Sequence, residues 1–230
     1  VSSAIPARAG NEEARTPTHA TTVGAARNEG VALANGRYIA FGDDDPDVLR
    51  GFISRALEVA KMNDFDIALA KNGASAPLSI NERIAPCDAG EFSTEVCSKL
   101  FQFTSPSPKY KLFKRELIES TGIAFQSVNC EETPLFTFGN LAEAKALRLF
   151  APLDTPPTIP QPSCVNSLSA NRCLIESLKS LHSFLGNAHA LPALLSTYQE
   201  ATLRLICDRL KALRDDSVRC SILDDMNESD

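Results

Sequence analysis

Three adjacent carboxylates, Asp43, Asp44 and Asp45, are the residues whose type and spacing most clearly suggest chemistry. Carboxylate oxygens are hard ligands that suit Mg²⁺ or Mn²⁺, and Mg²⁺ is usually held by one or two carboxylates together with substrate phosphates. Three like charges in a row repel one another, and an ordinary turn does not require them. The alternative is a solvated acidic turn in which only Asp45 matters, as the cap of a following helix. On the triplet alone, both interpretations stay open.

The neighbouring residues predict the elements that would position these carboxylates. Residues 25–34 have the composition of a helix, and residues 37–41, RYIAF, are aromatic and β-branched and too few for one. Asp45 and Pro46 then favour the start of a second helix, as its N-cap and first residue. The carboxylates would therefore follow the carboxyl end of a strand, which is where open α/β sheets bind ligands.

The order of these pieces resembles the middle of a family 2 glycosyltransferase with the GT-A fold. Residues 24–30, GAARNEG, are similar to the A-R-N-x-G helix of that family, and residues 36–41, GRYIAF, to its G-x-Y-I-x-F strand. Asp43 and Asp45 would be the two acidic positions of the D-x-D motif that follows. The resemblance implies an α/β, Rossmann-like GT-A sheet, a Mn²⁺ or Mg²⁺ cofactor held by Asp43 and Asp45, and donor binding by Asp43 and Asp44.

The resemblance also implies donor contacts upstream of the carboxylates. Residues 1–7, VSSAIPA, resemble the first strand of the family, which ends at a proline. By that match Pro6 and Ala7 would bind the donor. Arg27 and Asn28, on the helix before the second strand, would help to orient it.

The segment between the first strand and this helix departs from the family. Residues 7–22 are polar and punctuated by Gly10 and Pro17, whereas the family has two further strands there and an acidic residue that contacts the nucleotide base. A βαβ unit needs roughly 30 residues or more, so this segment cannot hold one. We therefore expect a reduced sheet and an incomplete donor-binding half.

Residues 109–125, KYKLFKRELIESTGIAF, resemble the K-L-F-R-R-E-L-L-E-x-x-G-I-x-F element on the acceptor side of these transferases. Read by periodicity alone, they predict a single helix with Gly122 as its C-cap. The apolar face of that helix would consist of Leu112, Phe113, Leu117 and Ile118.

Residues 129–136, NCEETPLF, resemble the Y-E-D-x-x-F motif whose Asp is taken to be the catalytic base, with Cys130 at the position of the aromatic residue, Glu131 at that of the Glu and Glu132 at that of the Asp. The resemblance implies that Glu132 is the base, with one methylene more than the Asp of the family. An acidic N-terminal turn on a helix running to Arg148 is an equally natural interpretation. Both interpretations are kept.

The composition divides the chain into four parts. Five prolines lie between residues 151 and 162, and apolar residues recur at helical spacing in two later segments, residues 169–185 and 191–213. These two segments predict an antiparallel helical hairpin. The expected parts are a GT-A-like domain over residues 1–150 with residues 7–22 abbreviated, a Pro-rich linker over 151–168, a helical region over 169–220, and a disordered tail over 221–230.

Charge and composition exclude several classes of protein. The net charge is −6, and the 23 basic residues are dispersed apart from those between Lys109 and Arg115, which argues against nucleic acid as the main partner. The seven cysteines form no CxxC pair, so a zinc site is not expected. The sequence has neither an apolar run of about 18 residues nor a secretory signal, which predicts a soluble, cytoplasmic protein without a transmembrane segment.

Together the motifs imply transfer of a sugar from a nucleotide diphosphate sugar, with UDP-sugars favoured, to a saccharide or lipid-linked acceptor with inversion. The resemblance also implies surface polysaccharide synthesis and work at the inner membrane face. The first alternative is an inactive GT-A remnant that serves as a binding or scaffolding protein. A second is an unrelated metal-dependent phosphotransferase that uses the same Asp cluster.

Overall fold

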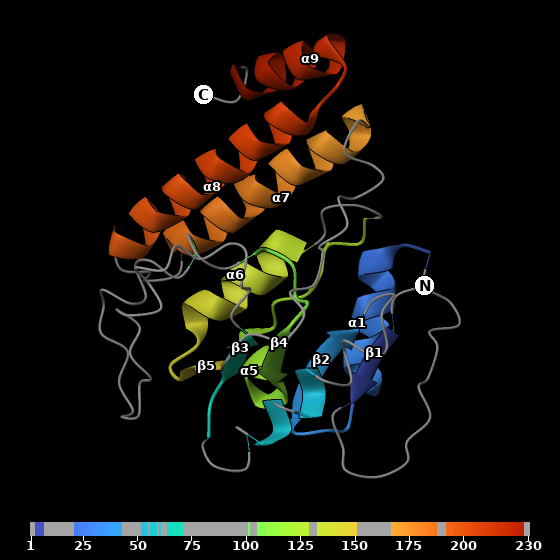
Figure 1. The fold of residues 1–230 in the computed structure, drawn as a ribbon, viewed down its shortest axis with the longest axis vertical. Coiled ribbons are helices and arrows are strands. Elements are labelled where there is room, and N and C mark those ends of the chain that lie inside the picture. Colours follow the sequence, from blue (N-terminus) through green and yellow to red (C-terminus); the bar gives the residue numbers. More distant parts are fainter. Residues whose placement is uncertain are drawn as a thin grey trace.

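The computed structural model describes residues 3–6, 21–42, 52–54, 56–58, 60, 64–70, 101, 105–128, 133–150, 167–187 and 192–227. In this part of the chain a five-stranded sheet forms the base of the molecule, with long helices above it (Figure 1). The strands are β1 (Ser3–Pro6), β2 (Tyr38–Gly42), β3 (Ile67–Ala70), β4 (Lys111–Lys114) and β5 (Leu147–Phe150).

The strands lie in the order β1-β2-β4-β3-β5. Antiparallel pairing joins β1 to β2, β2 to β4 and β4 to β3, whereas β3 and β5 are parallel. Consequently β2, β3 and β5 all end at one edge of the sheet, which we call the carboxyl edge. Strands β1 and β4 begin at this edge and end at the opposite one.

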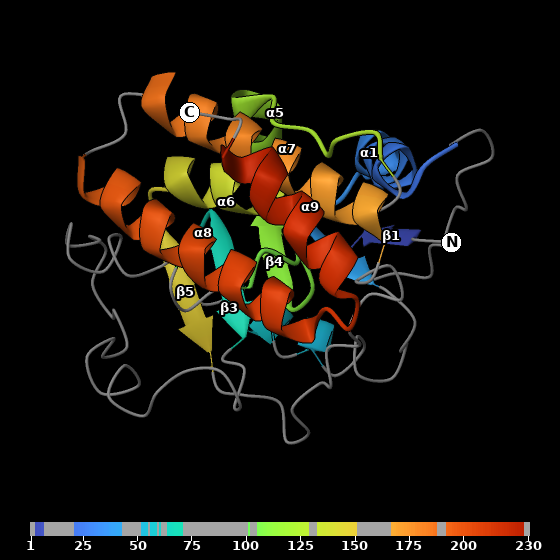
Figure 2. The ribbon, with the colours of Figure 1, turned by 90° about the horizontal axis from the view of Figure 1, so that it is seen from above.

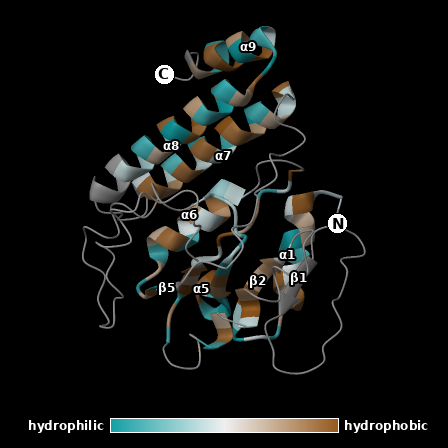
Figure 3. Ribbon diagram, viewed as in Figure 1, coloured by the Kyte–Doolittle hydropathy of each residue, from teal (hydrophilic) through white to brown (hydrophobic). Residues whose placement is uncertain are grey.

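Alternation of side chains along the strands gives the sheet two buried faces. On one face, Ile39, Phe41 and Phe113 belong to the larger core, which also includes Phe136 and Leu181 from the helices. On the other face a smaller core joins strand residues to a helical segment that includes Phe52 and Ala56. Hydrophobic residues dominate β2, as expected for a strand buried on both faces (Figure 3).

The helix expected over residues 25–34 is α1 (Val23–Leu33), and the strand expected over residues 37–41 is β2. The hydroxyl of Thr22 caps α1 by accepting a hydrogen bond from the Ala25 backbone N–H at 3.2 Å. The prediction of a helix followed by a buried strand before Asp43 is thus confirmed.

The prediction of a single helical face over residues 109–125 is wrong. Leu112 and Phe113 lie in β4, and the helix α5 (Arg115–Thr121) begins only after that strand. Leu112 packs in one core and Phe113 in the other, because consecutive strand residues point to opposite faces. Four residues are too few for periodicity to separate a buried strand from a helix. Gly122, with φ 64°, is the expected C-cap.

A helix from Glu131 to Arg148 is also ruled out. The helix α6 (Thr133–Glu143) ends before β5, which contains Arg148 and pairs in parallel with β3. Asp66 accounts for the break, since its carboxylate accepts hydrogen bonds from the backbone N–H groups of Lys145 and Ala146 at 2.8 and 3.0 Å. A contact 80 residues away in the sequence therefore ends this helix.

The expected hairpin consists of α7 (Leu168–Asn187) and α8 (Pro192–Ala212), which lie side by side in two views (Figures 1 and 2). Hydrophobic and hydrophilic residues are interspersed along the whole length of both helices (Figure 3). The Tyr198 hydroxyl of α8 donates a hydrogen bond to the Leu178 carbonyl of α7 at 2.5 Å. Helix α7 packs on α6 and shares the larger core with the sheet.

The prediction of a disordered tail over residues 221–230 is wrong for residues 221–227. A third helix, α9 (Asp216–Asn227), covers most of that segment. Its apolar residues Val218, Ile222 and Met226 recur every four positions and pack with Ile175 and Leu213. Within the described residues, no helix is long and apolar enough to cross a membrane.

Candidate functional site

The strongest candidate site lies where β2 ends. Strand β2 is buried along its whole length and ends at Gly42, directly before the three aspartates. Asp43, Asp44 and Asp45 themselves lie outside the described residues, as do Ala7 and Glu132. The structure therefore places Gly42, the residue before the acidic run in the sequence, at the carboxyl edge, and it describes three of the predicted site residues.

Pro6 is one of those three, and it lies at the opposite edge of the sheet. The register between β1 and β2 places Ser3 opposite Gly42, and Pro6 opposite Ile39. Three residues of strand correspond to about 10 Å. The structure thus does not bring Pro6 to the end of β2, because β1 runs antiparallel to that strand.

Asn28, in the middle of α1, binds the chain that follows α5. Its amide NH₂ donates to the Phe125 carbonyl at 2.8 Å, and its amide oxygen accepts from the Phe125 N–H at 2.9 Å. The side chain therefore satisfies one backbone donor and one backbone acceptor 97 residues away. With both ends of its amide engaged in this way, Asn28 acts as a clamp between α1 and residues 122–128.

Arg27 holds the same residue through its ring. The guanidinium lies over the Phe125 ring, 5.4 Å from its centroid, and the Arg27 side chain is buried. The Phe125 ring also stacks on the ring of Phe136 in α6, and the two ring centroids are 3.9 Å apart. Arg27 and Asn28 together fix the segment that leads from α5 toward α6.

Phe136 connects the two halves of the predicted site. Its ring lies 5.4 Å from the Phe41 ring and 5.3 Å from the Phe113 ring. Phe41 stands two residues before Asp43 in the sequence, and Phe136 stands four residues after Glu132. The contact therefore anchors the chain next to the acidic run and the chain next to the predicted base in one core.

Lys111 is a charged residue at the carboxyl edge to which the sequence motifs assigned no role in the site. It is the first residue of β4, only 5% exposed, and its ammonium group donates a hydrogen bond to the Ser107 carbonyl. Burial lowers the pKa of Lys111 to about 7. The signal in the sequence was weak, because a lysine in a basic segment usually faces water.

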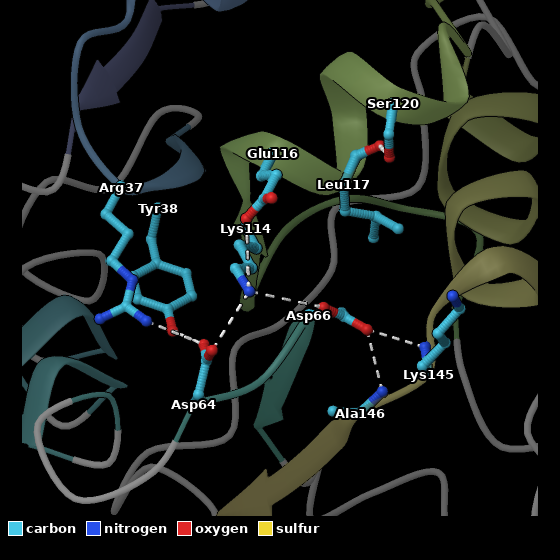
Figure 4. A network of polar contacts seen from close by, with 10 residues as sticks. All are labelled: Arg37, Tyr38, Asp64, Asp66, Lys114, Glu116, Leu117, Ser120, Lys145 and Ala146. Carbon is cyan, nitrogen blue, oxygen red and sulfur yellow. Dashed lines mark hydrogen bonds and ion pairs between the residues drawn. The ribbon is translucent and has the colours of Figure 1, made fainter.

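The opposite edge carries a network of exposed and half-buried charges around Lys114, the last residue of β4 (Figure 4). Lys114 lies 3.2 Å from Asp64, 3.5 Å from Glu116 and 4.0 Å from Asp66. Arg37 and the Tyr38 hydroxyl also donate to Asp64, at 2.9 and 3.3 Å. This network ties β2, β3 and β4 together and leaves none of its central charges without a partner.

The described residues include no cluster of three or more His, Cys, Asp or Glu side chains that could hold a metal. The predicted ligands Asp43 and Asp45 lie outside that part of the chain. As carboxylates that follow a buried strand at the carboxyl edge, they are the hard oxygen donors that Mg²⁺ and Mn²⁺ prefer. The residue types and the position of the strand end therefore fit such an ion.

Comparison with known proteins agrees with this arrangement. Residues 15–122 match the family model described as glycosyl transferase family 2. A curated relative, the poly(ribitol-phosphate) beta-glucosyltransferase of Bacillus spizizenii, is 29% identical over 136 residues, which make up 57% of this chain and 20% of the relative. The matched family segment includes Arg27, Asn28, the acidic run and Lys111, and it ends at Gly122, before Glu132.

The fold comparison identifies a solved structure with a similar fold. The crystal structure of S. aureus TarS 1-349 superimposes with a TM-score of 0.52 at 17% identity, over 80% of this chain and 52% of the solved one. This chain thus spans about half of that solved chain and about a fifth of the curated relative. Residues 15–122 therefore resemble glycosyl transferase family 2, and the α/β fold of the chain is of the GT-A type.

Proposed function

We propose that this chain is a glycosyltransferase that moves a sugar from a nucleotide diphosphate sugar to an acceptor hydroxyl, with inversion at the anomeric carbon. The observation that carries the proposal is that β2 ends at the carboxyl edge, where three strands end. Asp43 is the next residue in the sequence, and it belongs to the segment that matches the family. Open α/β sheets bind their ligands at such an edge.

The donor site is built on the three aspartates. Asp43 and Asp45 hold Mn²⁺ or Mg²⁺, and Asp43 and Asp44 contact the donor, for which a UDP-sugar is the first candidate. A bound divalent cation neutralises charge on the diphosphate leaving group. Arg27 and Asn28 enter this proposal as positioning residues, because their described contacts are to Phe125.

Glu132 is the proposed general base, which takes the proton of the acceptor hydroxyl as that oxygen attacks the sugar. It precedes α6, whose residue Phe136 packs against Phe41. This contact supports the assignment, since it anchors the chain near Glu132 to the strand that leads into the acidic run. A positioned base of this kind contributes about 10²- to 10⁴-fold to the rate.

The acceptor is proposed by analogy with the curated relative, whose name describes a poly(ribitol-phosphate) beta-glucosyltransferase. A hydroxyl-rich saccharide, or a polyol phosphate polymer of the cell surface, is the acceptor class that this analogy favours. An enzyme acting on such acceptors would work in the cytoplasm at the inner membrane face.

The proposal is tested by following UDP release from a panel of UDP-sugars, with Mn²⁺ and polymer acceptors present. We expect Glu132→Gln to lower kcat by at least about 100-fold, because the amide cannot accept the proton. The affinity for UDP should be unchanged. The matched control is Glu131→Gln, which removes the neighbouring charge. If Glu132→Gln turns over like the wild type, Glu132 is not the base. If the wild type binds UDP but transfers no sugar, the inactive binding protein becomes the better description.

A further inference from the structure

Lys111 combines deep burial with a position beside the proposed donor site. The register places it opposite Leu69 on β3. On the other side, Leu112 pairs with Ala40, so the next step of the ladder sets Lys111 opposite Phe41. Lys111 therefore lies at the carboxyl edge, beside the strand residue that precedes Asp43 by two positions.

The ammonium group of Lys111 lacks a counter-charge in the described part of the chain. A lysine has three N–H donors, and the hydrogen bond recorded for this one is to the carbonyl of Ser107. No ion pair with a described carboxylate accompanies it, and burial is the sole cause of its lowered pKa. Lysine is almost never buried without a charged partner, because desolvating a cation is costly. A bound anion would supply the counter-charge that the described residues do not give to the Lys111 ammonium group.

The backbone before Lys111 holds it in place at a conformational cost. Tyr110 has a φ of 56°, in the left-handed region that residues other than glycine rarely adopt. Strain of this kind amounts to about 1–3 kcal/mol and tends to occur at ligand sites. The turn before it is fixed by serine side chains: the Ser105 hydroxyl accepts from the Ser107 N–H, and the Ser107 hydroxyl from the Lys109 N–H. The loop that offers its Ser107 carbonyl to Lys111 is thus held by its own hydrogen bonds.

We infer that Lys111 binds a phosphate oxygen of the substrate, and that this phosphate belongs to the diphosphate of the nucleotide sugar. The inference rests on the proposed function and adds to it a cation supplied by the protein. A polyol phosphate acceptor would offer the same chemistry. Lys111 lies opposite Phe41 of β2, which precedes the acidic run by two residues. This position favours the donor over the acceptor as the source of the phosphate.

A fixed ammonium at this position would stabilise the leaving group in two ways. Its N–H groups give charge-assisted hydrogen bonds to phosphate oxygens, which are stronger than neutral ones. Because the group is already buried, little reorganisation is needed when negative charge builds up on the departing diphosphate. Lys111 thereby complements the proposed metal ligands from the adjacent strand.

The test measures binding by calorimetry, using the full chain at pH 7 with Mn²⁺. Methionine keeps the length of the side chain and removes the charge, so Lys111→Met is the main variant. We expect its Kd for UDP to rise about 10- to 100-fold, as for loss of a charged hydrogen bond. Lys145→Met, which removes an exposed lysine of the same domain, is the matched control and should stay within twofold of the wild type.

A second probe and a stability measurement separate the possible failures. If the wild type binds no UDP, the proposed function and this inference fall together. If the wild type binds UDP and Lys111→Met binds it equally well, the inference alone is overturned. It is also overturned if the variant loses affinity for ribitol 5-phosphate but not for UDP, because the phosphate then belongs to the acceptor.

Thermal unfolding distinguishes a ligand contact from a structural role. A buried, unpaired cation does not stabilise the fold, so Lys111→Met should melt at or above the wild-type Tm in the absence of nucleotide. A lower Tm with unchanged UDP affinity would assign Lys111 to the fold and contradict the inference. If the methionine variant does not accumulate as folded protein, Lys111→Gln serves for the same comparison.

Discussion

The two ends of β4 carry lysines in opposite electrostatic situations. Lys114 faces the carboxylates of Asp64, Asp66 and Glu116 (Figure 4). Burial alone would lower the pKa of Lys114, but its hydrogen bond to Asp64 and the three carboxylates more than offset this, so the pKa is raised. Lys111, three residues earlier, is more deeply buried, and its pKa is lowered to about 7.

The difference separates a structural edge of the sheet from a candidate ligand edge. At the edge of Lys114, the chain itself supplies the counter-charges, and they tie three strands together. At the carboxyl edge, the described residues leave a cation without a counter-charge beside the strand that leads into Asp43. Unbalanced buried charge tends to mark functional sites, because a fold gains nothing from it without a ligand.

The largest expected effect concerns the pH dependence of stability. In the folded chain Lys111 titrates at about 7, whereas its ordinary value is 10.5. Between these two pH values the unfolded chain binds more protons than the folded chain does. The free energy of unfolding should therefore rise as the pH is raised from 7 and fall as the pH returns to 7. The rise amounts to at most about 1.4 kcal/mol per pH unit. Urea denaturation at pH 7, 8 and 9, without metal or nucleotide, measures it.

The comparison of the two lysines provides the control for this prediction. Lys111→Met should flatten the pH dependence, because the group that takes up the proton on unfolding is gone. Lys114→Met should keep the wild-type slope, since the raised pKa of Lys114 lies above the range measured. Equal slopes in the wild type and Lys111→Met would show that Lys111 is not held with a lowered pKa.

An effect of similar size is expected at the opposite edge. Asp66→Ala removes the acceptor of two backbone N–H groups, those of Lys145 and Ala146, and should lower the free energy of unfolding by about 2–3 kcal/mol. Asp64→Ala is the matched control, because the Asp64 side chain is 59% exposed and its ion pairs should contribute about 1 kcal/mol or less. Equal losses in the two variants would contradict this view of the edge. UDP affinity should be unchanged in both.

The sequence predicted the local order of the elements around the acidic run. The helix before β2 and β2 itself lie within two residues of their expected bounds, because helix composition and the aromatic, β-branched run both act locally. The fold class also followed from the motifs. The metal and donor roles of the aspartates, and the role of Glu132, stay predictions.

What the sequence could not supply depends on contacts between distant segments. Leu112 and Phe113 look helical until β2 and β3 enclose them, and α9 forms on residues that looked like a polar tail. Lys111 gave no local sign of burial, because its environment comes from strands some 40 and 70 residues away in the sequence. Asn28 belongs to a recognised motif, but only the structure shows that its amide binds the Phe125 backbone.

The central claim is that the carboxyl edge of the sheet binds a nucleotide diphosphate through the acidic run. Calorimetric titration of the full chain with UDP in the presence of Mn²⁺ tests it most directly, with Asp45→Ala as the variant and Asp47→Ala as its neighbouring control. The account predicts saturable binding by the wild type and by Asp47→Ala, and loss of binding in Asp45→Ala. Absence of binding by the wild type, or undiminished binding by Asp45→Ala, would contradict it.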